Sequence, residues 1–159
     1  DLVDFFTDRT VRSEPPRLYR GTGSGFVENA QSANIRQPTL PMGSNFGDLN
    51  NDGFLDLATG GRLFINNGNA NHWLKIKLKG NGTTVNAAAI GAQVRIKLGD
   101  QTLSRRVGDT VGQGSQNNLT LHFGLGQHAD NVKYTVTWTN GETQEGETAV
   151  DQMIRVDMK

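Results

Sequence analysis

Oxygen-bearing side chains recur at alternate positions in residues 48–56, which read Asp-Leu-Asn-Asn-Asp-Gly-Phe-Leu-Asp. Carboxylate or amide oxygens stand at positions 1, 3, 5 and 9 of this segment, and position 7 offers a backbone carbonyl. Oxygen ligands at this spacing are typical of calcium, and the glycine at position 6 permits the positive φ that a sharp turn around an ion requires. The predicted calcium ligands are Asp48, Asn50, Asp52, the carbonyl of Phe54, and Asp56.

An EF-hand is excluded for this segment, because position 12 is Thr59, where that loop needs a bidentate Glu, and because strand patterns flank it. A solvated turn rich in Asn and Asp is the alternative, since both residue types form turns without an ion. Three carboxylates without the twelfth-position Glu predict a dissociation constant on the order of 10⁻⁴ to 10⁻³ M, the range of extracellular modules. Such a site would be filled outside a cell and largely empty in the cytosol.

Strands rather than helices must position this loop. Alternation of apolar and polar residues recurs from His72 to the end of the chain, whereas no window combines helical periodicity with caps. The pairs Gly99-Asp100 and Asn140-Gly141 lie between alternating runs and predict tight hairpin turns. About seven short strands with turn signals roughly every 8 to 12 residues predict an all-β chain that ends in an antiparallel β-sandwich.

The alternation also sorts the side chains of the predicted sandwich by face. The expected core residues are Leu74, Ile76, Val94, Ile96, Leu121, Phe123, Val136 and Trp138. The residues expected to be exposed are Lys75, Lys77, Arg95 and Lys97. If the strands near residues 76 and 96 are neighbours, these cations and Lys79 form one basic stripe. The stripe would attract an acidic ligand, or it is an ordinary solvated sheet face.

The first 70 residues contain an internal repeat. Asp1-Leu2-Val3 with residues 17–21 matches Asp56-Leu57-Ala58 with residues 62–66, at offsets of 55 and 45. A period near 45 residues is that of a propeller blade. Seventy residues hold at most one and a half blades, so the chain is expected to be the C-terminal fragment of a larger propeller protein. The polar segment 66–71 predicts a boundary between a blade remnant over 1–70 and the sandwich over 71–159.

Composition and charge exclude several classes of function. The chain has no Cys, which excludes a disulfide scaffold, a thiolate zinc site and a cysteine nucleophile. Sixteen Lys and Arg balance sixteen Asp and Glu, so the basic footprint of a nucleic-acid binder is absent. No apolar run approaches the roughly 18 residues of a transmembrane helix. We therefore expect neither a nucleic-acid partner nor a transmembrane segment.

The remaining motifs favour structural roles. The glycine-rich segment 21–25 lacks the Lys-Ser/Thr pair of a phosphate loop and is interpreted as a turn. His72, His122 and His128 are not spaced as a metal pair and are interpreted as packing or surface residues. No acid/base pair or nucleophile constellation is visible, so no catalytic residue is predicted in this chain, and the activity of the full-length parent protein stays open.

Two families resemble parts of this sequence. Residues 46–57 resemble the FG-GAP or VCBS repeat, the calcium-loop blade also found in integrin α-subunit propellers. Residues 71–159 resemble the ASPIC/UnbV domain, which follows such repeats in many bacterial secreted proteins and in the C-terminal region of cartilage acidic protein. The motifs that carry the second resemblance are Asn71-His72-Trp73-Leu74, Ile90-Gly91-Ala92, Gly114-Ser115-Gln116, Leu121-His122-Phe123-Gly124-Leu125-Gly126 and Trp138-Thr139-Asn140-Gly141. The family usually has Asp at position 50, where Asn lowers the loop charge by one, and Pro at position 139.

The resemblance implies a non-enzymatic, calcium-stabilised binding or adhesion module, extracellular or at the cell surface, with Ca²⁺ as its cofactor. Its partner would be a protein or glycan ligand that the resemblance does not identify. The alternative from another class is an accessory module, for example a carbohydrate-binding one, of a secreted polysaccharide-active enzyme whose catalytic part precedes Asp1.

Overall fold

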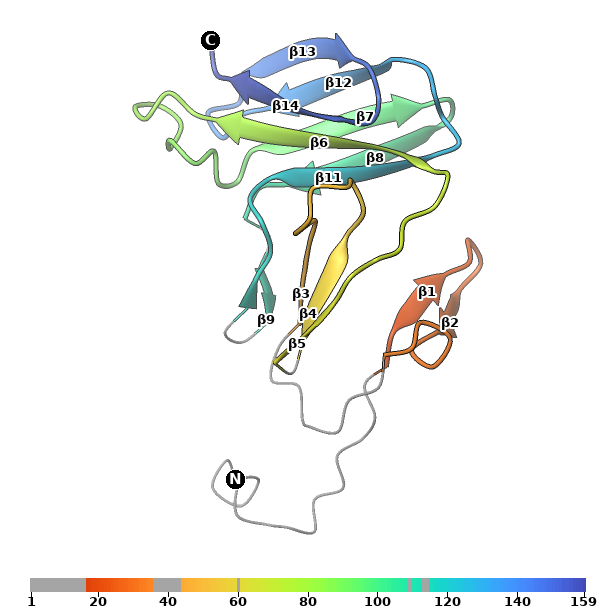
Figure 1. Ribbon diagram of the computed structural model, residues 1–159. Helices are drawn as coiled ribbons and strands as arrows, with labels where there is room; N and C mark the ends of the chain where they lie inside the picture. Colours follow the sequence, from red (N-terminus) through yellow and green to blue (C-terminus); the bar gives the residue numbers. More distant parts are fainter. Residues whose placement is uncertain (1–16, 36–43, 60, 109, 113–114) are drawn as a thin grey trace, which may run out of the picture.

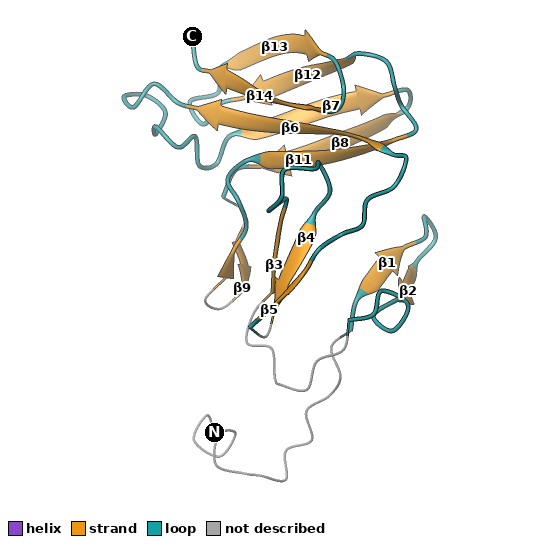
Figure 2. Ribbon diagram, viewed as in Figure 1, coloured by secondary structure: helices purple, strands orange, loops and turns teal. Residues whose placement is uncertain are grey.

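The computed structural model describes residues 17–35, 44–59, 61–108, 110–112 and 115–159. Within these ranges every regular element is a β-strand, which confirms the all-β prediction (Figure 2). None of these residues belongs to a helix that could cross a membrane. The start of the predicted internal repeat, Asp1 to Val3, lies outside the described residues.

Two sheets pack face to face in the C-terminal part and form the predicted sandwich (Figure 1). The first sheet has the strand order β11 (Leu121–Gly126), β6 (His72–Lys79), β14 (Gln152–Asp157). The second has the order β13 (Thr143–Thr148), β12 (Val132–Thr137), β7 (Gln93–Leu98), β8 (Gln101–Arg106). The short strands β9 (Thr110–Gly112) and β10 (Ser115–Gln116) form a hairpin between β8 and β11.

Both predicted hairpin turns are present. Gly99 adopts a φ of 56° between β7 and β8, and Gly141 adopts a φ of 89° between β12 and β13. The last strand differs from the purely antiparallel expectation, because β14 runs parallel to β6, with Ile154 opposite Ile76. A parallel neighbour needs a crossover, and the chain makes it by passing from β13 in one sheet to β14 in the other.

The interior of the sandwich confirms the predicted register. All eight expected core residues are buried, and Phe123, Ile76 and Val136 have no exposed surface. Lys77, Arg95 and Lys97 are exposed, as the alternation predicts. A slip of one residue would have exchanged these two sets.

Two predictions about the cations are wrong. Lys75 is buried, with 7% of its surface exposed, because a loop from the N-terminal half covers the outer face of β6 at that point. The single basic stripe does not exist, because β6 and β7 belong to different sheets. Lys77 therefore lies on the outer face of one sheet, and Arg95 and Lys97 lie on the outer face of the other.

The N-terminal half contributes a three-stranded antiparallel sheet and a separate hairpin. The sheet has the order β3 (Ser44–Gly47), β4 (Asp56–Thr59), β5 (Arg62–Phe64), and the hairpin pairs β1 (Tyr19–Gly21) with β2 (Phe26–Glu28). Their buried apolar cluster is small and consists of Ala30, Ile35 and Leu57, with Leu18 and Phe64 packed against it. The division into domains at residues 70 and 71 stays a prediction.

Candidate functional site

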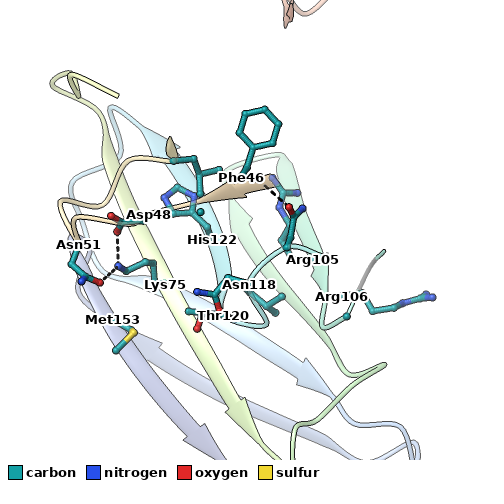
Figure 3. A pocket seen from close by; sticks show the side chains of 15 residues that line it. Phe46, Asp48, Asn51, Lys75, Arg105, Arg106, Asn118, Thr120, His122 and Met153 are labelled. Atoms are coloured by element: carbon teal, nitrogen blue, oxygen red, sulfur yellow. Dashed lines mark hydrogen bonds and ion pairs between the residues drawn. The ribbon is translucent and has the colours of Figure 1, made fainter. Parts of the chain in front are cut away.

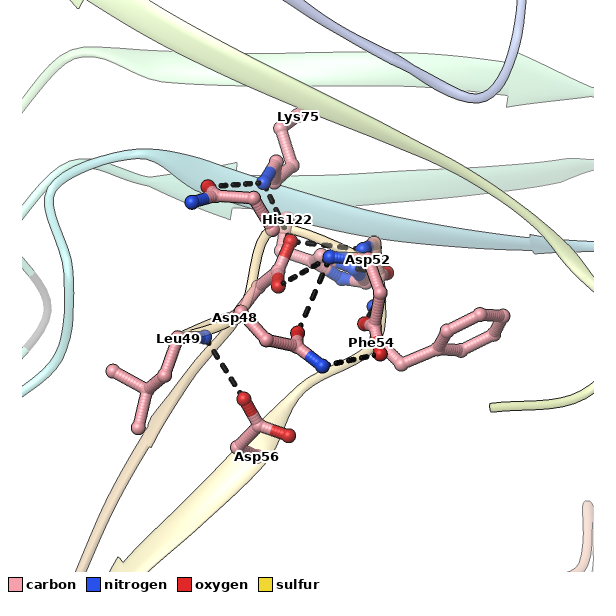
Figure 4. Close-up of polar contacts among 10 residues, drawn as sticks. Asp48, Leu49, Asp52, Phe54, Asp56, Lys75 and His122 are labelled. Atoms are coloured by element: carbon pink, nitrogen blue, oxygen red, sulfur yellow. Dashed lines mark hydrogen bonds and ion pairs between the residues drawn. The ribbon is translucent and has the colours of Figure 1, made fainter. Parts of the chain in front are cut away.

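The predicted calcium loop connects β3 to β4 and closes around the carboxylate of Asp48. Asp48 Oδ1 accepts a hydrogen bond from Asp52 N at 3.1 Å, and Oδ2 accepts one from Gly53 N at 3.0 Å. Two residues with positive φ, Asn51 at 61° and Gly53 at 91°, turn the backbone amides inward. Both oxygens of this carboxylate are thus oriented by the loop's own backbone (Figure 4).

Three of the predicted ligands share hydrogen bonds inside this loop. Asn50 Oδ1 accepts from Asp52 N at 3.2 Å, the same amide that bonds Asp48 Oδ1. Asn50 Nδ2 donates to Asp52 Oδ2 at 2.7 Å, and Asp52 Oδ1 accepts from Phe54 N at 2.9 Å. The side chains of Asp48, Asn50 and Asp52 are therefore linked to one another by hydrogen bonds within the loop.

Asp56 lies at the base of the loop and bonds to backbone. It is 1% exposed, and its Oδ2 accepts from Leu49 N at 2.8 Å while Oδ1 accepts from Asn66 N at 2.9 Å. Along the described parts of the chain, no three carboxylate or imidazole side chains converge closely enough to hold a metal ion. The donors fit calcium in chemical type, and the calcium site with its expected affinity stays a prediction.

The sandwich holds this loop from the sheet side. Trp73 on β6 packs its indole onto Gly53, where a Cβ atom would overlap the ring. His122 on β11 approaches the same glycine, with Nε2 2.7 Å from Gly53 O, and because a carbonyl only accepts, Nε2 carries the proton. Gly53 therefore has two roles, since it supplies the positive φ of the loop and leaves room for the indole.

Lys75 completes the contact between sheet and loop. It stands directly opposite His122 in the β6–β11 pairing, and its Nζ lies 2.5 Å from Asp48 Oδ2 and 3.4 Å from Asn51 Oδ1 (Figure 3). The side chains of Lys75 and Asp48 are 9% and 3% exposed, so this ion pair is shielded from water. The ammonium also lies 5.3 Å from the centroid of the Trp73 ring, within reach of a cation–π interaction.

The electrostatics of the contact follow from burial and from these partners. Burial alone would raise the pKa of Asp48, but hydrogen bonds from Lys75 and Gly53 and the charge of Lys75 outweigh it, so the pKa is lowered. Burial lowers the pKa of His122, against the opposing effects of Gly53 O and Asp48. Asp48 is therefore charged and His122 neutral at neutral pH.

A cavity of about 260 Å³ opens beside this contact, between the blade and the sandwich. Its lining mixes the exposed ring of Phe46 with polar side chains that include Arg105, Asn118 and His122 (Figure 3). The edge strand β3 is held at this point by Asn117, whose Oδ1 accepts from Phe46 N at 3.1 Å.

Sequence reasoning found the loop but missed the side chains that hold it. Lys75 belongs to an alternating strand in which it is indistinguishable from Lys77. The only available signal was Trp73, a large aromatic residue on the face expected to be solvated, two residues before Lys75.

Comparison with known families agrees with the two resemblances. A family model described as an FG-GAP-like repeat matches residues 4–59, and one described as ASPIC and UnbV matches residues 82–159. No curated protein compared with the chain matches it. The predicted calcium loop lies within the first match, and most of the sandwich lies within the second. The chain thus carries an FG-GAP-like repeat followed by an ASPIC and UnbV domain.

Proposed function

We propose that this chain is a non-enzymatic, calcium-stabilised binding module that works outside the cell. FG-GAP-like repeats are typical of extracellular proteins, where calcium is abundant enough to fill a weak site. The observation that carries the proposal is the loop itself, in which hydrogen bonds link the side chains of Asp48, Asn50 and Asp52 and Gly53 packs against the sandwich. Calcium would be held by these side chains and would neutralise their charge.

Calcium binding would stabilise the contact between the two halves. An ion that binds only the folded loop stabilises the protein by about 1.4 kcal/mol at ten times its dissociation constant. For a chain of this size, that free energy corresponds to a rise in melting temperature of roughly 3–6 °C.

A thermal unfolding experiment tests this role. The full chain is unfolded in EDTA and in 10 mM CaCl₂, alongside Asp52→Ala and the matched control Asp130→Ala, an exposed carboxylate in the loop between β11 and β12. Calcium should raise the melting temperature of the native protein and of Asp130→Ala, whereas Asp52→Ala should show no rise. An equal rise in all three proteins would exclude the loop as the binding site.

The cavity beside the loop is our candidate for the ligand site of the module. It combines apolar surface at Phe46 and Leu55 with polar groups at Asn118 and Thr120, a mixture that suits small or chain-like ligands. An aromatic face next to side-chain amides also suits a sugar, which supports the alternative of an accessory carbohydrate-binding module.

A binding screen separates these two functions. The full chain is applied to a glycan array and, in parallel, to immobilised extracellular-matrix proteins, each with Phe46→Ala and with the control Phe26→Ala, an exposed ring on β2 away from the cavity. Glycan binding that Phe46→Ala weakens favours the accessory module, and protein binding weakened in the same way favours adhesion. Binding that is unaffected by Phe46→Ala would place the ligand elsewhere.

A further inference from the structure

The lysine that contacts the calcium loop is unusual in its burial. Of the three lysines on the outer face of β6, Lys77 and Lys79 are exposed, and only Lys75 is buried. Burying an ammonium group is costly unless an anion compensates it, and the anion here is Asp48, the first predicted calcium ligand. The protein itself therefore already places one positive charge, from β6, against the loop.

The position of this charge determines its effect. Lys75 Nζ bonds Asp48 Oδ2, while Oδ1 faces Asp52 N and shares that amide with Asn50 Oδ1. Backbone amides thus already orient both oxygens of the Asp48 carboxylate, so Lys75 is not needed to fix the orientation of that carboxylate. What Lys75 adds is charge, and it changes the formal charge of Asp48, Asp52 and Asp56 from −3 to −2.

We propose that Lys75 is a tethered cation that competes with calcium for the charge of Asp48, so that it keeps the loop docked on the sandwich without metal and weakens calcium binding. This inference rests on the proposed calcium role and specifies which residue sets the affinity. The competition is strong because Asp48 and Lys75 are both shielded from water. Away from water, the repulsion between an ammonium and a calcium ion that share one carboxylate is poorly screened.

Coupling of this kind is reciprocal. If calcium and the ammonium compete, removal of the ammonium must strengthen calcium binding and must also make the docked loop depend on calcium. If Lys75 merely packed between sheet and loop, its substitution would lower stability equally with and without calcium. The sign of the calcium effect therefore separates a competing cation from a packing residue.

Two substitutions test the inference in the full chain. Lys75→Met keeps the length and apolar stem of the side chain but removes its charge, and Lys75→Gln keeps a hydrogen-bond donor without charge. The matched control is Lys77→Met, which removes the same charge from the same face of the same strand at an exposed position. Calcium affinity is measured from the amide chemical shifts of Asp52 and Gly53 during CaCl₂ addition, with MgCl₂ at equal ionic strength as a control for screening.

Both Lys75 variants should bind calcium at least about tenfold more tightly than the native protein, which corresponds to about 1.4 kcal/mol. In EDTA they should unfold at least about 4 °C below the native protein, because a shielded carboxylate loses its partner. Calcium should remove most of this deficit. Lys77→Met should behave as the native protein in both measurements.

Two outcomes would contradict the inference, and a third would support it. If the native protein binds calcium but the Lys75 variants bind it equally or more weakly, Lys75 does not compete and the proposed calcium role stands. If neither the native protein nor any variant binds calcium, the calcium role and the inference both fall. If only the Lys75 variants bind, the competition is supported, and the native loop is held by lysine in place of calcium. Should Lys75→Met fail to fold even with calcium, Lys75→Gln decides between these outcomes.

Discussion

The sandwich and the N-terminal half consist of similar short strands, but they enclose very different amounts of apolar surface. In the described residues the buried cluster of the sandwich has sixteen members from Leu74 to Val156, whereas that of the N-terminal half has three. Both strands of the β1–β2 hairpin are exposed along their whole length. The comparison indicates that the sandwich is stabilised from within, and the N-terminal half by its polar loop and by contacts with its neighbour.

The most direct way to break this comparison is to separate the halves. Residues 71–159 expressed alone should unfold in one cooperative transition, because their apolar cluster is complete without the blade. Residues 1–70 expressed alone should show no such transition. Circular dichroism during thermal unfolding measures both. A sandwich that is unfolded in isolation would mean that the blade and the sandwich form one cooperative domain.

The next largest difference is expected from two phenylalanines. Phe123→Ala removes a fully buried ring from the sandwich and should lower the free energy of unfolding by about 3–5 kcal/mol. Phe26→Ala removes a ring that is 79% exposed on β2 and should change it by less than about 0.5 kcal/mol. Urea unfolding of the full chain provides both values. Equal losses would show that the hairpin has a buried role that its exposure does not reveal.

A pair of glycines sharpens the comparison at the contact between the halves. Gly53 and Gly23 both have positive φ, but a Cβ at Gly53 meets Trp73, whereas one at Gly23 has no neighbour within 4 Å. Gly53→Ala should therefore cost about 1–3 kcal/mol more than Gly23→Ala, because it combines backbone strain with overpacking. It should also shift Trp73 fluorescence to longer wavelength as the ring becomes exposed. An unchanged spectrum in Gly53→Ala would contradict the packing of Trp73 on the loop.

The smallest effect is a dependence of stability on pH. The folded pKa of His122 is lowered by burial, so the unfolded chain binds this proton more readily. The contribution is fully present above the unfolded pKa of about 6.5 and is lost as the pH falls below that value toward the folded pKa. The other charged groups acting on His122 are Asp48, Lys75 and Arg105, and Asp48, with its lowered pKa, stays ionised throughout this window.

Urea unfolding in EDTA between pH 8 and pH 5 measures this slope. His122→Gln, whose amide can still donate to Gly53 O, should flatten it. The matched control is His128→Gln, a histidine outside the loop contact, which should leave the slope unchanged. A slope that persists in His122→Gln would assign it to another group.

Local sequence determined the strands, their register and the shape of the loop. A period of two specifies which side chains share a face, which is why Phe123, Ile76 and Lys77 lie where the alternation predicts. Turn residues act locally in the same way, since the absence of a side chain makes the positive φ of Gly99 and Gly141 readily accessible. The loop also closes through its own backbone amides, so its spacing in the sequence was sufficient to identify it.

Only the tertiary structure decided what covers each face. Alternation places Lys75 and Lys77 on the same face of β6 but contains no information about which of them another segment will cover. Alternation does not determine which strands are neighbours either. β6 pairs with β11 and β14 rather than with β7, and pairing with β7 would have joined the cations into one stripe. These contacts join residues far apart in the chain, Asp48 with Lys75 and Gly53 with His122, and no local pattern encodes a distant partner.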